Sequence, residues 1–297
     1  MAYTEIQEKK DKKYYYRVKS IKRDKKVSKK KIYLGFDLLP QELIKKEAEA
    51  DKELGILSAI LKKEELEFLE TIKRDFSKEP KENFENRYES FCSLFTYDST
   101  GIEGSTLTSD DTYFLLFEGI VPKEKSLREI NETLNHKKAF DYMLEYKGDI
   151  TKEFILELHK IMTINTFRQD LIPQIGRYRT VQVFVGSSLP PKPDDVPDKM
   201  ASLLRWYSNN KKLHPLIIAT YFHAEFEKIH PFVDGNGRVG RLLMNFILHK
   251  NKFPMINIPK KRRGKYYDVL REAQYKGNLR PFLEFLISIL KKDSLRF

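Results

Sequence analysis

One segment of the chain contains residue types at spacings that could carry out chemistry. It spans residues 229–241 and reads Ile-His-Pro-Phe-Val-Asp-Gly-Asn-Gly-Arg-Val-Gly-Arg. His230 is an imidazole that can accept a proton near neutral pH. Asp234 offers a hard carboxylate oxygen, which Mg²⁺ prefers together with substrate phosphates. Arg238 and Arg241 are three residues apart, so on a helix both guanidinium groups lie on one face and can bind phosphate oxygens.

The residues on either side of this segment predict how it is held. An apolar helical pattern over 215–229 leads into it, and a second one over 239–248 leads out of it. Backbone N–H groups at the start of a helix are unpaired and bind anions. Gly235 and Gly237 would let a ligand approach the backbone around Asn236 closely. The pattern therefore predicts a cradle for a magnesium-bound nucleotide, with a general base at its edge.

The order His-Pro-Phe-x-Asp-Gly-Asn-Gly-Arg-x-x-Arg resembles the active-site motif of the Fic family, and every defined position matches. The resemblance covers roughly residues 82–290. It implies a mainly α fold with a Fic-type helical core, and transfer of AMP from ATP to a Ser, Thr or Tyr hydroxyl of a protein target. In that reaction His230 would take the proton and Asp234 would hold Mg²⁺.

The same resemblance assigns roles to the other residues of the motif. Gly235, Asn236 and Gly237 would form an anion hole where charge develops during an in-line displacement. Arg238 and Arg241 would hold the β- and γ-phosphates of the nucleotide. The required partners are thus ATP with Mg²⁺ and a protein that presents a hydroxyl side chain.

A second segment with a recognisable pattern precedes the motif in the chain, at residues 99–108. Ser99, Glu103 and Gly104 form a Ser-x-x-x-Glu-Gly pattern, which is similar to the inhibitory motif of autoregulated Fic proteins. The resemblance implies that Glu103 pairs with Arg241, where its carboxylate takes the guanidinium that the γ-phosphate would use and repels that phosphate. The alternative is a solvated surface glutamate. A helix is expected over 82–97, directly before this segment.

Residues 176–186 show the one convincing strand pattern in the body of the chain. In Fic proteins this position holds a β-hairpin flap that clamps the target segment beside the active site. The flap residues expected to line the nucleotide and to align the target by β-augmentation are Val183, Phe184, Val185 and Gly186. The alternative is a hairpin with a structural role only.

Two further residues fall in a segment that resembles the Fic region holding the base and ribose. Tyr267 could contact the nucleotide, and helix packing explains it equally well. Gln274 stands where family members often have Asn, and its longer amide can still form hydrogen bonds. His223 lies two helical turns before His230 and is predicted to be a hydrogen-bonded, partly buried histidine rather than a zinc ligand.

The composition of the chain divides it into three parts. Residues 1–35 carry a net charge of +9 out of +12 for the whole chain. We expect a basic β-hairpin appendage over 1–37, a helical arm over 38–81, and a Fic catalytic domain over 82–297. The hairpin itself is predicted over 14–35 from the alternation of its residues. A basic aromatic ribbon could bind nucleic acid, and the alternative is a hairpin whose lysines face solvent and protect its edges.

Cysteine usage and hydropathy restrict the class of protein. Cys92 is the single cysteine, so no internal disulfide is possible, which fits a reducing cytoplasm. The sequence has no signal peptide pattern and no apolar run long enough for a membrane span, so we expect a cytoplasmic protein without membrane partners. A homodimer is expected by analogy with Fic proteins that have an N-terminal inhibitory helix.

Three other functions are compatible with the sequence. The same site could run in reverse and remove AMP from a modified protein, with Glu103 orienting a water. It could transfer another nucleotide. A non-enzyme alternative is a nucleic-acid-associated regulator that acts through residues 1–35, although that function leaves the 229–241 segment unexplained.

Overall fold

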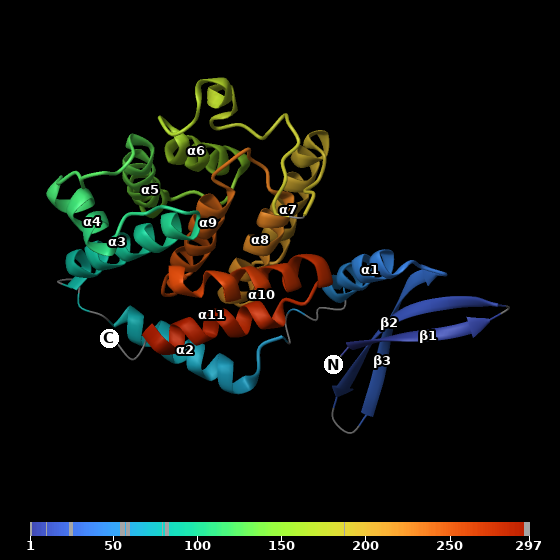
Figure 1. Ribbon diagram of the computed structural model, residues 1–297. Coiled ribbons are helices and arrows are strands. Elements are labelled where there is room, and N and C mark those ends of the chain that lie inside the picture. The colour runs from blue at the N-terminus through green and yellow to red at the C-terminus, as the bar shows by residue number, and fades with distance from the viewer. Residues whose placement is uncertain are drawn as a thin grey trace.

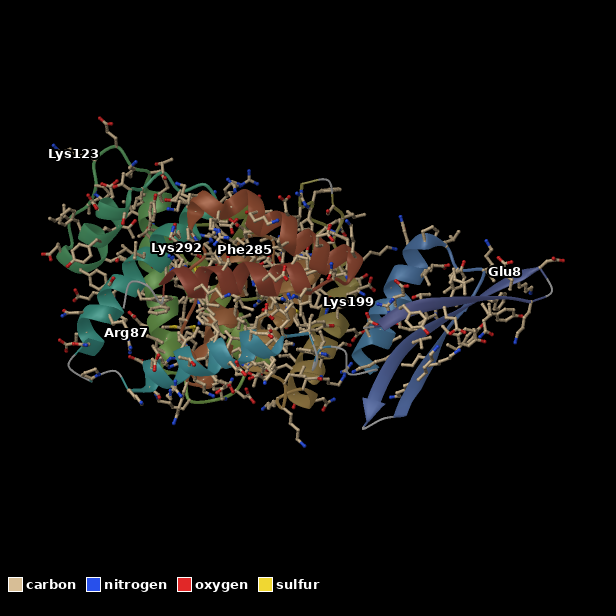
Figure 2. All side chains as sticks on the ribbon, turned by 90° about the horizontal axis from the view of Figure 1, so that it is seen from below. Glu8, Arg87, Lys123, Lys199, Phe285 and Lys292 are labelled. Atoms are coloured by element: carbon tan, nitrogen blue, oxygen red, sulfur yellow. The ribbon has the colours of Figure 1, made fainter. Side chains whose placement is uncertain are left out.

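The structure is a computed structural model with a helical body and a β-sheet that stands to one side of it (Figure 1). The residues that it describes are 2–9, 11–23, 26–53, 57, 60–78, 80, 83–186 and 188–293. The sheet is joined to the body through α1 (Pro40–Glu53), and Figure 2 shows the same separation from below. Within the described residues, no helix is both long and apolar enough to cross a membrane.

The N-terminal sheet has three antiparallel strands in the order β1-β2-β3. They are β1 (Ala2–Lys9), β2 (Lys12–Arg23) and β3 (Lys26–Phe36). The predicted hairpin over 14–35 corresponds to β2 and β3, but the prediction missed β1. Polar and charged residues occupy most of β1 after Thr4, which weakens its own strand signal. β1 is instead held as a strand by its pairing with β2, which runs from Ala2↔Lys19 to Lys9↔Lys12.

The helical arm is two separate helices, α1 and α2 (Lys63–Ser77). α1 is held to the sheet by Arg17, whose guanidinium forms two hydrogen bonds to the Asp51 carboxylate, at 2.6 and 2.8 Å. α2 is held to the body, because Leu69 is fully buried in the main core and the Glu65 carboxylate binds the Arg280 guanidinium through both oxygens. The second half of the arm therefore packs as part of the helical body.

In the described residues, eight main helices form the body together with α2, and α9 lies at its centre (Figure 1). They are α3 (Phe84–Ile102), α5 (Leu127–Glu145), α6 (Lys152–Thr163), α7 (Val196–Asn209), α8 (Pro215–Ile229), α9 (Asn236–Lys250), α10 (Arg263–Lys276) and α11 (Arg280–Asp293), with a short α4 (Ser109–Tyr113) after α3. α9 contacts α3, α5, α6 and α8. It is buried on nearly every side, and its buried residues include the polar Asn236, Arg238, Arg241 and Asn245. This central position makes the start of α9 a rigid place for a site.

Hydroxyl side chains cap the starts of two body helices. The Ser126 hydroxyl accepts a hydrogen bond from the Glu129 backbone N–H at 3.2 Å, and the Glu129 carboxylate accepts one from the Ser126 N–H at 3.3 Å. The Thr151 hydroxyl accepts from the Phe154 N–H at 3.2 Å and caps α6. Both starts position residues that contact the loop between α8 and α9.

The helix predicted over 82–97 is longer than expected, because α3 continues to Ile102. Ser and Thr are poor helix formers, but tertiary contacts can outweigh propensity. Here Ser99 and Thr100 are both buried, and the Thr100 hydroxyl donates a hydrogen bond to the Thr96 carbonyl at 2.8 Å. The helix ends where Glu103 caps it and Gly104 adopts a φ of 114°.

Candidate active site

The loop between α8 and α9 is fixed by two left-handed residues and by one amide side chain. His230 ends α8 with a φ of 51°, and Gly235 precedes α9 with a φ of 81°. The Asn236 side chain accepts a hydrogen bond from the Phe232 N–H and donates one to the Phe232 carbonyl, both at 2.9 Å. Asn236 therefore shapes the loop with its side chain, while its backbone lies at the start of α9.

His159 on α6 supports this loop, and it was not identified from the sequence. Its ring stacks on Phe232 with centroids 3.8 Å apart and planes within 4°. Nδ1 accepts a hydrogen bond from the Gly176 N–H at 3.0 Å, so Nε2 carries the proton and donates it to the Asp234 carbonyl at 3.1 Å. Burial lowers the pKa of His159 to about 4, which keeps this arrangement at neutral pH. The signal in the sequence that could have identified His159 is its position on the apolar face of its helix.

His230 has the environment of a general base. Its Nδ1 lies 3.3 Å from the Glu227 carbonyl, which only an N–H can satisfy, so Nε2 is the basic nitrogen of the neutral ring. Burial lowers the pKa of His230 below its ordinary value of 6.5. The neutral form that accepts a proton therefore predominates at neutral pH.

Glu227 is a buried carboxyl beside this histidine, and the sequence reasoning missed it as well. One oxygen lies 3.8 Å from His230 Nδ1, and the other is buried without a hydrogen-bond partner in the described part of the chain. A Cβ at Gly240 would lie 2.6 Å from that second oxygen, so the glycine makes room for it. Burial, followed by the charge of Glu103, raises the pKa of Glu227 to about 8, and Arg241 opposes the shift.

Glu227→Gln is expected to make the protein less sensitive to alkaline pH. A carboxyl whose pKa is raised in the folded state stabilises the fold fully below its unfolded value of 4.5, and that contribution is lost as pH rises through about 8. Glutamine does not titrate, so the stability of the variant relative to wild type should increase from pH 5 to pH 8, by on the order of 1–3 kcal/mol. Thermal melts at unit pH steps test this, with Glu225→Gln on the same helix as control. A constant difference between variant and wild type would contradict it.

Arg241 on α9 and the end of α3 meet in a buried network. The Arg241 Nη2 donates to the Glu103 carboxylate at 2.7 Å and to the Ser99 carbonyl at 2.9 Å, and its Nε donates to the Ser99 hydroxyl at 3.0 Å. The guanidinium side chain is 1% exposed and the Glu103 side chain 34%. The pairing expected from the Ser-x-x-x-Glu-Gly pattern is therefore present. A Cβ at Gly237 would lie 2.2 Å from the Glu103 carboxylate, so this pairing requires glycine there.

Arg238 and Asp234 belong to a second charged cluster on the other side of the loop. Arg238 Nη2 donates to Asp234 Oδ1 at 3.3 Å, and Arg128 Nη2 on α5 donates to Asp234 Oδ2 at 3.0 Å. Glu132 bridges the two arginines, at 2.9 Å from Arg128 Nε and 3.4 Å from Arg238 Nη1. Arg128 and Glu132 were not identified from the sequence, because only the fold brings α5 to this loop.

The donors and acceptors in these clusters suit a nucleotide phosphate with a magnesium ion. Nη1 of Arg241 and Nε of Arg238 are buried without a hydrogen-bond partner among the described residues, whereas Arg238 Nη1 has the ion pair with Glu132. Such donors can bind phosphate oxygens. The Asp234 side chain is 40% exposed and is an oxygen ligand of the kind that Mg²⁺ uses with substrate phosphates. No group of three or more His, Cys, Asp or Glu residues that could hold a metal occurs in the described ranges, so phosphates and water would complete the coordination.

Comparison with known proteins identifies the family. A model of the Fic/DOC family matches residues 149–248, the stretch that includes α6, α8 and most of α9. The chain is 39% identical over 201 residues to the protein adenylyltransferase Fic of Drosophila persimilis, a match that covers 66% of this chain and 39% of that relative. The chain belongs to the Fic/DOC family. The match spans well under half of the insect protein's length.

Solved structures extend the Fic likeness beyond the matched stretch. Fic-1 from C. elegans is similar with a TM-score of 0.70 at 27% identity, covering 88% of this chain and 77% of that chain. A Fic domain containing signalling protein from Bacteroides thetaiotaomicron is similar with a TM-score of 0.68 at 27% identity, covering 76% and 93%. The fold is thus a mainly helical Fic fold preceded by a three-stranded antiparallel sheet.

The β-hairpin flap expected in this Fic domain does not form within the described residues. Val185 and Ser188 form an isolated bridge around Gly186, and Val183 and Phe184 belong to no strand. Side chains take the carbonyls that a strand ladder would use, because Arg179 donates to Val181 and Pro191 and Gln182 donates to Val183 and Pro190. The side chains do alternate as in a strand, but the prediction did not consider that these side-chain donors compete with a partner strand for the carbonyls.

Arg179 fixes this irregular flap segment to the Fic loop. It is 2% exposed, its Nε donates to the His230 carbonyl at 2.8 Å, and its backbone N–H donates to the Pro231 carbonyl at 2.9 Å. Its other nitrogens reach the Val181 carbonyl at 3.1 Å and the Pro191 carbonyl at 2.5 Å. A single buried guanidinium thus connects the backbone of the general base to both ends of the flap segment.

Arg179→Ala is expected to lower the free energy of unfolding by about 2–4 kcal/mol, because three backbone carbonyls lose a buried, charged donor. Urea unfolding monitored by circular dichroism measures the change. Arg177→Ala, which removes an exposed arginine two residues away, is the matched control. Equal losses in the two variants would show that the buried contacts contribute little.

The two residues expected near the base and ribose differ in their placement. Tyr267 is partly buried, and the charges of Glu103 and Arg241 act on its hydroxyl, so the fold brings it to the site. Gln274 is buried and donates a hydrogen bond to the Ala224 carbonyl at 3.3 Å, which ties α10 to α8. His223 is buried with its Nε2 2.7 Å from the Tyr266 hydroxyl, as predicted for a hydrogen-bonded histidine.

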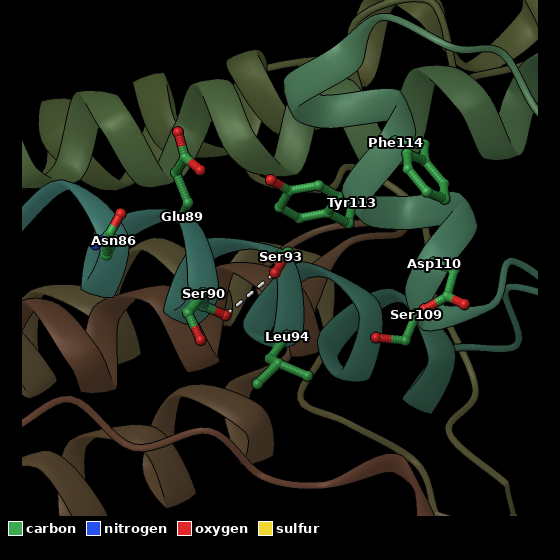
Figure 3. A pocket seen from close by; sticks show the side chains of 9 residues that line it. All are labelled: Asn86, Glu89, Ser90, Ser93, Leu94, Ser109, Asp110, Tyr113 and Phe114. Atoms are coloured by element: carbon green, nitrogen blue, oxygen red, sulfur yellow. Dashed lines mark hydrogen bonds between the residues drawn. The ribbon is translucent and has the colours of Figure 1, made fainter. Parts of the chain in front are cut away.

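A separate pocket lies between α3 and α4 (Figure 3). It is an open, largely polar hollow, and the Ser93 hydroxyl at its floor donates to the Ser90 carbonyl at 3.1 Å. Its lining residues are Asn86, Glu89, Ser90, Ser93, Leu94, Ser109, Asp110, Tyr113 and Phe114. None of these belongs to the Fic motif or to the network around Arg241, so the pocket is not part of the candidate site.

Proposed function

We propose that this chain is a protein adenylyltransferase that moves AMP from ATP to a Ser, Thr or Tyr hydroxyl of a protein target. One observation carries the proposal. A basic imidazole nitrogen of His230, the carboxylate of Asp234 and the unpaired donors of Arg238 and Arg241 converge on the start of α9. Relatives named protein adenylyltransferase Fic support the activity.

The proposed reaction is an in-line displacement at the α-phosphorus of ATP. His230 Nε2 takes the proton of the target hydroxyl, and the hydroxyl oxygen bonds to that phosphorus. The bond from the α-phosphorus to the oxygen shared with the β-phosphate breaks, and pyrophosphate leaves. Backbone N–H groups of residues 235–237 stabilise the charge that develops at the start of α9.

Two arginines and a carboxylate hold the leaving group in this scheme. Arg238 and Arg241 bind the β- and γ-phosphates, and Asp234 would hold Mg²⁺, which neutralises phosphate charge. Because Asp234 binds Arg128 in the structure, that arginine must release one carboxylate oxygen before the aspartate can bind a cation. Every residue in the scheme comes from one chain, so the reaction does not itself require the homodimer that we expect by analogy.

Glu103 is proposed to inhibit the reaction. It occupies Arg241 Nη2, the same guanidinium that the γ-phosphate requires, and its charge repels that phosphate. ATP therefore binds either weakly or in a position where its α-phosphorus is too far from His230 and the target hydroxyl to react.

The target segment is proposed to bind along the flap segment that Arg179 fixes. Large apolar side chains point to solvent there, namely Val181, Phe184, Val185 and Leu189, with Phe184 77% exposed. The Val183 backbone N–H and the backbone groups of Gly186 would be available to an added strand, the mode of recognition that aligns a peptide by its main chain.

The experiment that tests the function is mass spectrometry of the Glu103→Gly variant after separate incubation with ATP, GTP, UTP and CTP. The expected result is covalent AMP on the variant itself with ATP and Mg²⁺, and a fragment spectrum that places it on a hydroxyl side chain. If only another nucleotide modified the variant, the transferred group would be that nucleotide and not AMP. Absence of any modification, with ATP binding intact, would contradict nucleotidyl transfer.

Removal of AMP from a modified protein is the second candidate function. The observation that favours it is that the Glu103 charge acts on His230, so the carboxylate lies close enough to orient a water near the base. Wild-type protein should then release AMP from an adenylylated protein, and Glu103→Gly should not. Equal release by both would exclude a role for the carboxylate.

Arg128→Ala is expected to lower the Mg²⁺ concentration needed for half-maximal auto-modification by up to about 5-fold. The arginine competes with a cation for Asp234, and an exposed charge pair of this kind contributes up to about 1 kcal/mol. The measurement is a Mg²⁺ titration in the Glu103→Gly background, with Arg205→Ala as control. A raised Mg²⁺ requirement would mean that Arg128 assists the cation instead.

A further inference from the structure

The N-terminal sheet has two chemically different faces, and the proposed reaction uses neither. Side chains alternate between faces along a strand, so Tyr16 and Arg17 point to opposite sides. Arg17 lies on the face toward α1, where it binds Asp51, and Thr4 binds Glu47 on the same side. The Tyr16 side therefore faces away from α1 and from the helical body.

Aromatic rings cover this outer face. The strand register places Tyr16 opposite Tyr33, and Tyr14 opposite Phe36. Ring centroids are 5.3 Å apart for the first pair and 6.1 Å for the second, while Tyr14 and Tyr33 are 6.4 Å apart. Tyr33 and Phe36 are each 50% exposed, and Tyr3 on β1 is 41% exposed. Four rings thus form a continuous platform whose members contact each other and solvent.

Lysines surround the platform. Lys12 Nζ lies 4.6 Å from the centre of the Phe36 ring, and Lys29 Nζ lies 5.8 Å from that of Tyr3. Glu5 on the sheet binds Lys31 at 2.7 Å, and Glu47 and Asp51 of α1 bind Arg17. The appendage therefore presents π faces together with uncompensated positive charge, on a surface away from the active site.

We propose that this outer face of the sheet binds single-stranded nucleic acid. Unpaired bases stack on exposed aromatic rings, and a backbone phosphate lies near each base, where lysines at the edge of the platform can reach it. A duplex hides the faces of its bases, so it could use the lysines but not the rings. The charge of the face is opposite to that of the ligand, and the ring spacing exposes more than one stacking position.

The test uses the full chain and fluorescence anisotropy with labelled 12-nucleotide single strands of DNA and RNA, and with a duplex of the same sequence. Wild type is expected to bind a single strand more tightly than the duplex. Tyr33→Ala and Phe36→Ala should each weaken that binding by about 5- to 100-fold. Tyr33→Phe and Phe36→Tyr keep the rings and should retain binding, which separates stacking from loss of folding.

Matched controls lie on the helical body. Tyr275→Ala and Phe114→Ala remove aromatic side chains that are 49% and 45% exposed, and should leave binding unchanged. Lys12→Gln with Lys29→Gln should lower the slope of log affinity against log salt by about 1.4, since single strands contribute about 0.7 per phosphate contact. The control pair is Lys123→Gln with Lys199→Gln, both exposed and labelled in Figure 2.

Four outcomes would overturn the proposal. They are no binding at low salt, tighter binding to the duplex, equal loss in the sheet and body variants, and full competition by heparin at equal charge, which would indicate a site for polyanions without bases. None of these outcomes depends on adenylyl transfer, so the proposal and the proposed enzyme activity can fail separately.

Discussion

Glu103→Gly is expected to raise the rate of auto-adenylylation by about 100-fold, which corresponds to about 2.7 kcal/mol of transition-state stabilisation. The substitution removes the carboxylate that occupies Arg241 and the negative charge that faces the γ-phosphate. Arg241 remains held, because its Nε and Nη2 still donate to the Ser99 hydroxyl and carbonyl. The measurement is incorporation of label from α-labelled ATP into the protein at fixed Mg²⁺.

A second variant separates the charge of Glu103 from the space its side chain fills, and a third serves as control. Glu103→Gln keeps the size of the side chain without its charge, and an intermediate rate is expected. Glu124→Gly is the matched control, since Glu124 is exposed and already has a φ of 58° that glycine adopts freely. A Glu103→Gly rate no higher than that of the control would refute inhibition by this residue.

His230→Ala in the Glu103→Gly background is expected to lower the rate by about 10²- to 10⁴-fold, the usual contribution of a general base. Binding of ATP should persist, because the phosphates are held by Arg238 and Arg241. Calorimetric titration with ATP and the incorporation assay together distinguish loss of the base from loss of the nucleotide site. His249→Ala near the end of α9 serves as the histidine control.

The pH profile of the Glu103→Gly variant checks the same assignment. The base form of His230 increases with pH, and burial places its pKa below 6.5, so the acidic limb of the activity profile should have its midpoint below pH 6.5. An acidic limb centred at or above pH 7 would show that another group supplies the base. Substantial activity after removal of the imidazole would lead to the same conclusion.

The sequence carried enough information for the loop of the Fic motif, because its chemistry resides in residue types at fixed local spacing. The placement of Glu103 against Arg241 followed from the resemblance alone, as 138 positions separate them. The roles of Arg179 and His159 could not be predicted from the sequence, for a physical reason. A buried arginine or histidine gains its role from the carbonyls that tertiary packing brings to it, and a single sequence does not show which carbonyls those are.

The errors at element boundaries have the same origin. Residues 181–185 alternate like a strand, but two side chains take their carbonyls and those of Pro190 and Pro191. Residues 98–102 have weak helical propensity, but Arg241 and burial hold them in α3. In the first case side chains of the same segment, and in the second a donor 142 positions away, outweighed the local preference.

The firm attachment of the end of α3 determines how quickly inhibition can be relieved. Asp98 accepts hydrogen bonds from the Lys260 backbone N–H at 2.7 Å and from the Asn257 amide at 2.6 Å, and Lys260 Nζ donates to the Ser105 carbonyl at 3.0 Å. These contacts flank Glu103 on both sides. Its backbone is fixed, so only its side chain can leave the guanidinium.

Rotation of a partly exposed side chain takes picoseconds to nanoseconds, whereas displacement of a helix takes microseconds to milliseconds. In the proposed scheme the inhibited and open forms therefore interconvert far faster than a catalytic cycle. The apparent affinity for ATP is then lowered in proportion to the fraction of molecules in which Glu103 has left Arg241. An open fraction of about 1% would lower it about 100-fold. Time courses of the wild type should accordingly start without a lag.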